Sequence, residues 1–281
     1  MARIVYVNGD YLPEDQGKIS IFDRGFLFAD GVYEVTAVIN GKLVDYDPHM
    51  ERLERLLSEL RMGWPCSKDE LKAMHLEMVK RNSLHEGIIY CQVTRGSADR
   101  DFKFPKDAKP TLIAFTQEQK LVDNTNAVTG TKVVTIPDIR WARRDIKSVA
   151  LLAPVLGKQA AYEQGAQEGW MVEDGFITEG TSSNAYIVKD GKVITRGLSN
   201  AILAGCTRRS LFRLAKEKGI VIEERNFTAE EAYAADEAFL TSASQFVMPI
   251  VEIDGRRIGG GQPGPVVRKL RELFLEEAGN S

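Results

Sequence analysis

Residues 32–60 have the sequence VYEVTAVINGKLVDYDPHMERLERLLSEL, and this pattern indicates a unit that mixes strands and helices. Val32–Ile39 is rich in β-branched residues, which favour strands. Asn40-Gly41 is a strong two-residue turn signal, so we expect the chain to return as a second strand over Lys42–Tyr46. The pattern therefore predicts a β-hairpin.

A helix is expected directly after this hairpin. Asp47 is the predicted cap and Pro48 stands in the first turn, where proline is tolerated. An apolar stripe follows at helical spacing, formed by Leu53, Leu56, Leu57 and Leu60. Arg52 lies about 40° from Leu56 around the helix, at the border of the stripe. It could reach an anion in a cleft while its stem packs, or be a surface arginine that extends to solvent.

The rest of the chain shows the same mixture, and we predict an α+β or α/β protein of two domains. Residues 1–120 form the expected N-terminal domain, 121–130 a polar interdomain linker, and 131–281 the C-terminal domain. The expected elements before the linker are a hairpin at 4–12, a helix at 67–82, and strands at 87–95 and 111–116. After it we expect strands at 132–136, 169–173, 184–189, 192–195 and 238–241, a hairpin at 251–258, and helices at 152–164, 207–218 and 265–277.

Composition excludes several classes of function. The net charge of −3 and a pI near 5.8 give no reason to expect nucleic acid or a membrane surface as partner. Three widely spaced cysteines argue against a disulfide framework, and neither cysteines nor histidines have the spacing of metal ligands. The N-terminus does not resemble a signal peptide, and the longest apolar stretch, 149–156, is too short to span a membrane. We expect a cytoplasmic protein without a metal.

Lys147 is a candidate catalytic residue. Arg143 and Arg144 precede this lysine, and apolar residues 149–152 follow it. Cationic neighbours and an apolar surface would destabilise the ammonium form and free the amine for Schiff-base chemistry. A solvated lysine before a helix is the alternative.

Three further segments combine polar groups with turns. Glu179 begins a run of small polar residues that could bring backbone N–H groups to a ligand, or form an ordinary hairpin turn. Cys206 and Thr207 open a helix, whose N-terminus suits a phosphate, although a plain threonine cap explains the same pattern. A similar turn at Ser242-Ala243 follows a strand.

Taken together and in order, these segments resemble the D-amino-acid transaminase family of fold-type IV pyridoxal-phosphate (PLP) enzymes, which are class IV aminotransferases. The resemblance covers essentially the whole chain. Its motifs are DRGFLFADGVYEV (23–35), HMERL (49–53), YCQVTRG (90–96), DIRWARRDIKS (138–148), TEGTSSN (178–184), ILAGCTR (202–208), FLTSAS (239–244) and PIVEIDGRRIGGG (249–261).

The resemblance implies a two-domain fold with PLP in the interdomain cleft, and it implies a homodimer. Lys147 would form the Schiff base with the cofactor and carry the proton between the substrate Cα and the cofactor. Glu179 would keep the pyridine nitrogen protonated. The cofactor phosphate would be bound by Arg52, Cys206, Thr207, Ser242 and Ala243, the last through its backbone only, since the family often has a hydroxyl there.

The implied substrates are D-amino acids, such as D-alanine and D-glutamate, with 2-oxo acids. Tyr33 and Arg100 match positions of the family's trap for the substrate carboxylate, and arginine suits this task because it pairs bidentately. The chain has Phe102 where well-known members have a histidine, so we expect weaker carboxylate binding or a shifted substrate range. Alternatives are an (R)-amine or branched-chain L-amino-acid transaminase, and an aminodeoxychorismate lyase.

Overall fold

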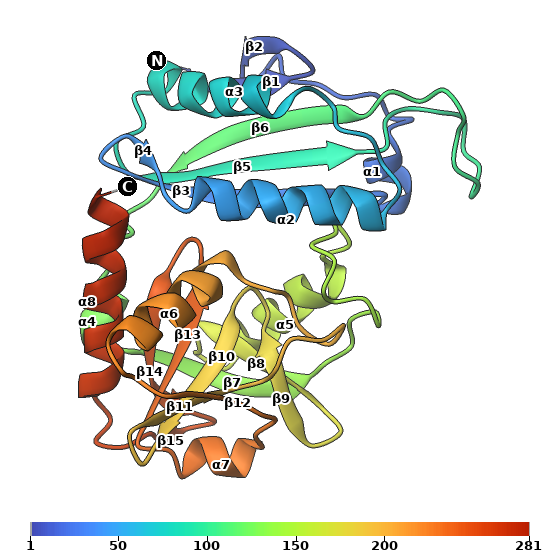
Figure 1. Ribbon diagram of the computed structural model, residues 1–281. Helices are drawn as coiled ribbons and strands as arrows, with labels where there is room; N and C mark the ends of the chain where they lie inside the picture. The colour runs from blue at the N-terminus through green and yellow to red at the C-terminus, as the bar shows by residue number, and fades with distance from the viewer. Residues whose placement is uncertain (1, 281) are drawn as a thin grey trace. The chain divides into compact units, whose positions relative to one another are not determined.

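A computed structural model describes residues 2–280, which form two compact units of mixed strand and helix (Figure 1). The first unit comprises the chain up to Lys120 together with Ile146–Ala150. The second comprises Leu121–Asp145 and Leu151–Asn280. The short segment 146–150 therefore packs with a part of the sequence that ended some 25 residues earlier, and this segment contains Lys147.

An antiparallel sheet forms the centre of the first unit, with strand order β2-β1-β6-β5-β3-β4. Its strands are β1 (Ile4–Val7), β2 (Asp10–Pro13), β3 (Gly31–Ile39), β4 (Lys42–Leu43), β5 (Gly87–Thr94) and β6 (Thr111–Glu118). Both predicted asparagine-glycine turns are present. Asn8 and Gly9 have positive φ values of 50° and 111°, which asparagine and glycine tolerate better than other residues.

The helices of this unit are α1 (Arg24–Phe28), α2 (Tyr46–Glu59) and α3 (Lys68–Arg81). The leucine stripe of α2 packs with α3 and the sheet in one apolar core. α3 begins with a capping box between Ser67 and Glu70.

The predicted start of α2 was wrong. β4 ends at Leu43, so the chain turns earlier than expected, and Asp45 is the N-cap, with φ 51° and no side-chain capping bond. Asp47 lies inside the first turn, where its charge still suits the helix dipole.

A mixed sheet forms the centre of the second unit, with strand order β12-β11-β10-β13-β14-β7-β8-β9 and with β15 paired to β14. Its strands are β7 (Thr131–Pro137), β8 (Glu168–Glu173), β9 (Phe176–Gly180), β10 (Asn184–Lys189), β11 (Lys192–Thr195), β12 (Ile222–Glu224), β13 (Glu237–Ser242), β14 (Phe246–Ile253) and β15 (Arg256–Arg257). β14 begins five residues before the strand expected at Val251, directly after the turn that follows β13.

The helices of the second unit are α4 (Thr125–Thr129), α5 (Leu152–Glu163), α6 (Cys206–Glu217), α7 (Ala229–Tyr233) and α8 (Pro265–Asn280). α8, red in Figure 1, packs against β13, β14 and α6. The expected linker, 121–130, contains α4 and packs with this unit, because Leu121 is buried and α4 contacts β14. Among residues 2–280, no helix combines the length and apolar character needed to cross a membrane.

His75 of α3 is a buried histidine with one unsatisfied nitrogen. Its Nδ1 lies 2.8 Å from the carbonyl oxygen of Leu71, whereas its Nε2 has no hydrogen-bond partner among residues 2–280. Burial lowers the pKa of His75 from 6.5 to about 4. The imidazole is therefore neutral in the folded protein at pH 7.

We predict that His75 makes the first unit sensitive to acid. The pKa of His75 is lower in the folded than in the unfolded protein. His75 therefore leaves the free energy of unfolding unchanged above pH 6.5 and lowers it as the pH falls from 6.5 towards 4. The slope is about 1.4 kcal/mol per pH unit. Between pH 6.5 and 5 the wild type should therefore lose about 2 kcal/mol more than a His75→Leu variant in urea unfolding. Parallel pH profiles for the two proteins would contradict this.

Candidate active site

The predicted site residues fall into two groups, one in each unit. The first unit holds Tyr33, Arg52, Arg100, Phe102 and Lys147, and the second holds Glu179, Cys206, Thr207, Ser242 and Ala243. In the first unit Lys147 lies over Tyr33, and Arg100 lies beside Phe102. In the second unit the helix that begins with Cys206 and Thr207 packs against the strand that ends at Ser242.

Lys147 is fixed by backbone pairing to β3. The N–H of Tyr33 donates to the carbonyl oxygen of Lys147 at 3.1 Å, and the N–H of Val149 donates to Gly31 at 3.1 Å. Val32 and Ser148 form a β-bridge between these bonds. The lysine thus lies in a short strand-like segment, although the sequence showed no strand signal there.

The side chain of Lys147 extends over Tyr33. Its Nζ lies 4.2 Å from the centroid of the Tyr33 ring, which stacks in turn on Tyr90 at 5.3 Å. Lys147 is half-buried. The amine is therefore held above an aromatic face by both its backbone and its side chain.

The two arginines before Lys147 are paired with carboxylates. Arg143 donates to Asp145 at 2.9 Å, and Arg144 donates to Glu173 at 2.7 Å. Their charges are compensated, so the structure gives no support to the argument that they act on Lys147 as cationic neighbours.

Arg52 forms a bidentate pair with Glu34 of β3. Its Nε and Nη2 each donate to a carboxylate oxygen of Glu34 at 2.7 Å, and Nδ1 of His49 lies 2.7 Å from the same carboxylate. Glu34 is fully buried. Burial alone would raise the pKa of Glu34, but the charge and hydrogen bonds of Arg52, with His49, hold it far below its usual range.

Sequence reasoning missed Glu34, although a signal was present. It lies at every-second-residue spacing with Val32, Thr36 and Val38, which puts a carboxylate on the buried face of β3. A buried carboxylate requires a cationic or hydrogen-bonding partner. The partner is 18 residues away on α2, which a strand pattern does not reveal.

Arg100 and Phe102 lie in an exposed loop that connects β5 and β6. The Arg100 guanidinium lies 5.4 Å from the ring of Phe28 and 5.5 Å from that of Phe102. Phe102 has 77% of its surface exposed. Within the described part of the first unit, Arg100 makes no ion pair, so its charge is balanced only by aromatic faces and solvent.

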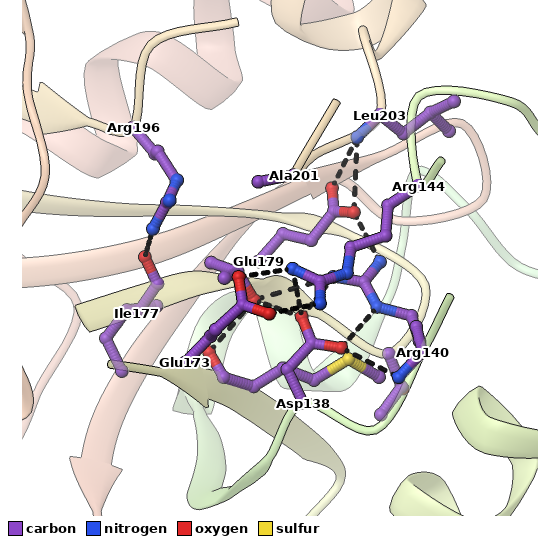
Figure 2. A network of polar contacts seen from close by, with 12 residues as sticks. Asp138, Arg140, Arg144, Glu173, Ile177, Glu179, Arg196, Ala201 and Leu203 are labelled. Carbon is purple, nitrogen blue, oxygen red and sulfur yellow. Dashed lines mark hydrogen bonds and ion pairs between the residues drawn. The ribbon is translucent and has the colours of Figure 1, made fainter. Parts of the chain in front are cut away.

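Glu179, at the end of β9, is the buried centre of a polar network (Figure 2). Its carboxylate accepts hydrogen bonds from Arg140 at 2.5 Å, from the Asn184 side chain at 2.9 Å and from the Leu203 N–H at 3.1 Å. Burial raises the pKa of Glu179, while the charge of Arg140 acts in the opposite direction. Its position and orientation are thus set by three separate segments of the second unit.

Arg140 itself is bound by two carboxylates. It donates to both oxygens of Asp138, at 3.0 and 2.7 Å, as well as to Glu179 (Figure 2). Burial would lower the pKa of Arg140, but the bonds to Asp138 and the charge of Glu179 raise it above its ordinary value. Arg140 lies within the motif at 138–148, yet nothing in its spacing distinguished it from its neighbours.

Cys206 and Thr207 form the first turn of α6. The N-cap is Gly205, with an extended backbone (φ −66°, ψ 138°) and no side-chain capping bond. Both residues are buried. Ser242 ends β13, against which α6 packs, and its buried hydroxyl has no hydrogen-bond partner in the described part of the chain. A helix N-terminus and an unsatisfied hydroxyl are the groups that an oxyanion would satisfy.

Gly205, the N-cap of α6, lies against Asn184, one of the residues that donate a hydrogen bond to Glu179. A Cβ at this position would lie 2.3 Å from Oδ1 of Asn184, whose amide donates to Glu179 and to the carbonyl of Leu203. The close approach explains why the helix starts with a residue that has no side chain.

Comparison with known proteins identifies the family. The model of the amino-transferase class IV family matches residues 31–253, and the chain therefore belongs to this family of aminotransferases. It is 38% identical over 273 residues to a D-alanine aminotransferase of Staphylococcus haemolyticus, covering 96% of both chains. The resemblance seen in the sequence is thereby confirmed.

Solved structures agree on the fold. A branched-chain amino acid aminotransferase of Escherichia coli matches with a TM-score of 0.91 and 23% identity, covering 99% of this chain and 95% of that one. A branched-chain amino acid aminotransferase of Thermoproteus uzoniensis, solved with norvaline, matches with a TM-score of 0.87 and 26% identity, covering 98% and 94%. The predicted mixed fold of fold-type IV enzymes is confirmed.

We predict that the Glu34 cluster is a strong determinant of stability. Glu34→Gln keeps the shape but leaves the largely covered Arg52 side chain beside a neutral group, which should lower the free energy of unfolding by about 3–5 kcal/mol. Urea denaturation measures this. Glu54→Gln is the control, because Glu54 and Lys68 form a solvent-exposed pair of less than about 1 kcal/mol. An equal decrease in the free energy of unfolding in the two variants would show that the Glu34 cluster contributes no more to stability than an exposed ion pair.

Proposed function

We propose that this aminotransferase uses PLP to move the amino group between D-amino acids and 2-oxo acids. The observation that carries the choice of substrate is the 38% identity, over nearly the full chain, to relatives named D-alanine aminotransferase. The observation that supports the cofactor is the buried carboxylate of Glu179, held by Arg140, Asn184 and Leu203.

The residues fit PLP in chemical terms. Lys147 offers an amine to the aldehyde, and Glu179 offers a carboxylate to the pyridine nitrogen. The first turn of α6 and the hydroxyl of Ser242 offer donors to a phosphate. When bound, PLP supplies an electron sink for the pair of electrons released at the substrate Cα.

We assign Lys147 two tasks, to hold the cofactor through its amine and to carry the proton between substrate and cofactor. Its backbone bonds to β3 limit where the amine can go. Tyr33, beneath the amine, would orient it and contribute to binding the substrate carboxylate. Glu179 would accept a hydrogen bond from the protonated pyridine nitrogen, with Arg140 helping to keep the carboxylate ionised.

Arg52, Cys206, Thr207, Ser242 and the backbone of Ala243 would bind the phosphate. Glu34 adds to this assignment, because its bidentate pairing with Arg52 fixes the plane of the guanidinium. An arginine oriented in this way loses little conformational freedom when an anion binds.

We further propose that the substrate carboxylate is bound by Arg100 and that the protein acts as a homodimer. Exposed apolar residues would be covered by a second copy, among them Phe26, Phe102 and Leu152, each with more than 70% of its surface exposed. The three cysteines are free, in keeping with a reducing cytoplasm.

Phe102 favours a second candidate function. It places an aromatic ring beside Arg100 where well-known D-amino-acid transaminases have a histidine. An apolar surface at this point would suit an (R)-amine or an apolar D-amino acid. The similarity to branched-chain amino acid aminotransferases keeps branched-chain L-amino acids as a further candidate. An aminodeoxychorismate lyase would use the same lysine and glutamate.

We predict that Lys147→Ala lowers transaminase activity by at least about 10³-fold, because the amine holds the cofactor and moves the proton. Activity with D-alanine and a 2-oxo acid measures this. Borohydride reduction of the wild type with PLP should label the peptide that contains Lys147. Lys192→Ala, at an exposed lysine of β11, is the control and should retain full activity. Labelling of another lysine would contradict the assignment.

A panel of amino donors tests the substrate class. We expect D-alanine to be used well with a common 2-oxo acid, and L-leucine poorly. Efficient use of L-leucine without D-alanine would overturn the D-amino-acid proposal. Rapid use of (R)-1-phenylethylamine would favour the amine alternative, and pyruvate release from aminodeoxychorismate without any 2-oxo acid would indicate a lyase.

Phe102→His tests the role of the loop. A polar partner beside Arg100 should raise kcat/KM for D-glutamate by about tenfold, the effect of one hydrogen bond to a charged group. Unchanged or lower kcat/KM would show that Phe102 does not lie at the substrate carboxylate.

A further inference from the structure

Phe246 has a backbone conformation that a bulky residue rarely adopts. Its φ is 57°, in the left-handed region where glycine and asparagine are usual. It is the first residue of β14, pairs with Ser242 across the hairpin, and follows the turn 243–245. A conformation of this kind persists only where the surroundings hold it.

α8 provides that support from one face. The guanidinium of Arg271 donates through Nη1 to the carbonyl oxygens of Gln245 and Val247, each at 3.0 Å. These carbonyls belong to the residues on either side of Phe246. Three residues further along α8, the ring of Phe274 lies 5.1 Å from that of Phe246, which is buried. Arg271 and Phe274 thus hold the backbone and the side chain of the same strained residue.

The bonding of Arg271 is unusual for a buried cation. Only 8% of its surface is exposed, and Nη2 donates to the carbonyl oxygens of Leu121 and Val122, at 2.9 and 3.0 Å. Within residues 2–280 it has no carboxylate partner, and burial lowers its pKa. Hydrogen bonds to four carbonyl oxygens compensate a positive charge less well than a carboxylate does. These bonds do, however, fix the backbone segments to which the four carbonyls belong.

Two of the predicted phosphate contacts lie at the start of the turn that Arg271 holds: Ser242 ends β13, and Ala243 is the first residue of the turn. The Ser242 hydroxyl is buried and no described residue forms a hydrogen bond with it, so it is available to a ligand. We propose that Arg271 is a positioning residue for this turn, and that it presents Ser242 and the backbone of Ala243 to the phosphate of the cofactor. This inference rests on the proposed function, since it takes PLP as the ligand.

The test compares PLP with pyridoxal, which lacks the phosphate. Dissociation constants for both are measured by visible absorbance on the wild type, Arg271→Met and Arg271→Lys. We expect Arg271→Met to weaken PLP by at least about tenfold, or 1.4 kcal/mol, and pyridoxal by less than about twofold. Arg271→Lys keeps a donor and should lie between the wild type and Arg271→Met.

Phe227→Leu is the control for a general loss of stability. Phe227 is buried in the core of the same unit, against Trp170, and belongs neither to the turn nor to α8. This variant should lower the melting temperature without changing the ratio of PLP to pyridoxal affinity. If Arg271→Met does not fold, Phe274→Leu replaces it, with an expected loss of about threefold for PLP alone.

Two outcomes would overturn the inference while leaving the proposed function intact. One is that the Arg271 variants, or Phe274→Leu in their place, weaken PLP and pyridoxal by the same factor. The other is that they change neither affinity although the wild type binds PLP. Failure of the wild type to bind PLP at all would overturn the proposed function, and the inference with it.

Discussion

The backbone pairing between residues 147–149 and β3 is the constraint on which the chemistry proposed for this protein depends. Two hydrogen bonds and a β-bridge join this segment to Gly31, Val32 and Tyr33. A lysine side chain is long and flexible. Its amine reaches one defined atom reliably only when the backbone that carries it is held in place. Here the chain connects two parts of the second unit through a segment that packs with the first, and the lysine lies in that segment.

Two buried carboxylates, one in each unit, show two ways in which the protein compensates a buried charge. Glu34 and Glu179 are both buried, and each is paired with an arginine, Arg52 and Arg140 respectively. The consequences differ. The pairing with Arg52 and His49 holds the pKa of Glu34 far below its usual range, whereas burial of Glu179 prevails over Arg140 and raises its pKa. Glu34 is therefore suited to orienting an arginine, and Glu179 to receiving a further positive partner.

Much of the fold was predictable because its signals are local. Asn8-Gly9 and Asn40-Gly41 mark hairpins, Ser67 caps α3, and β10 and β11 begin and end where the pattern put them. A turn or a cap needs only a few adjacent residues, so its sequence is sufficient. The start of α2 was misplaced because an aspartate two residues earlier adopts a left-handed conformation, which the local sequence does not require. The short elements α1, α4, α7, β9 and β12 were missed because they have too few residues for a periodic signal.

The sequence by itself determined the family, the candidate lysine, glutamate and arginine, and the position of the helix that begins at Cys206, since ordered motifs at fixed spacing carry this information. Only the tertiary structure decided which groups surround them. Glu34 meets Arg52 across 18 residues, Arg140 meets Glu179 across 39, and Arg271 meets Leu121 across 150. Each of these contacts arises when separate segments pack, and no local periodicity or propensity encodes which distant partner will be adjacent.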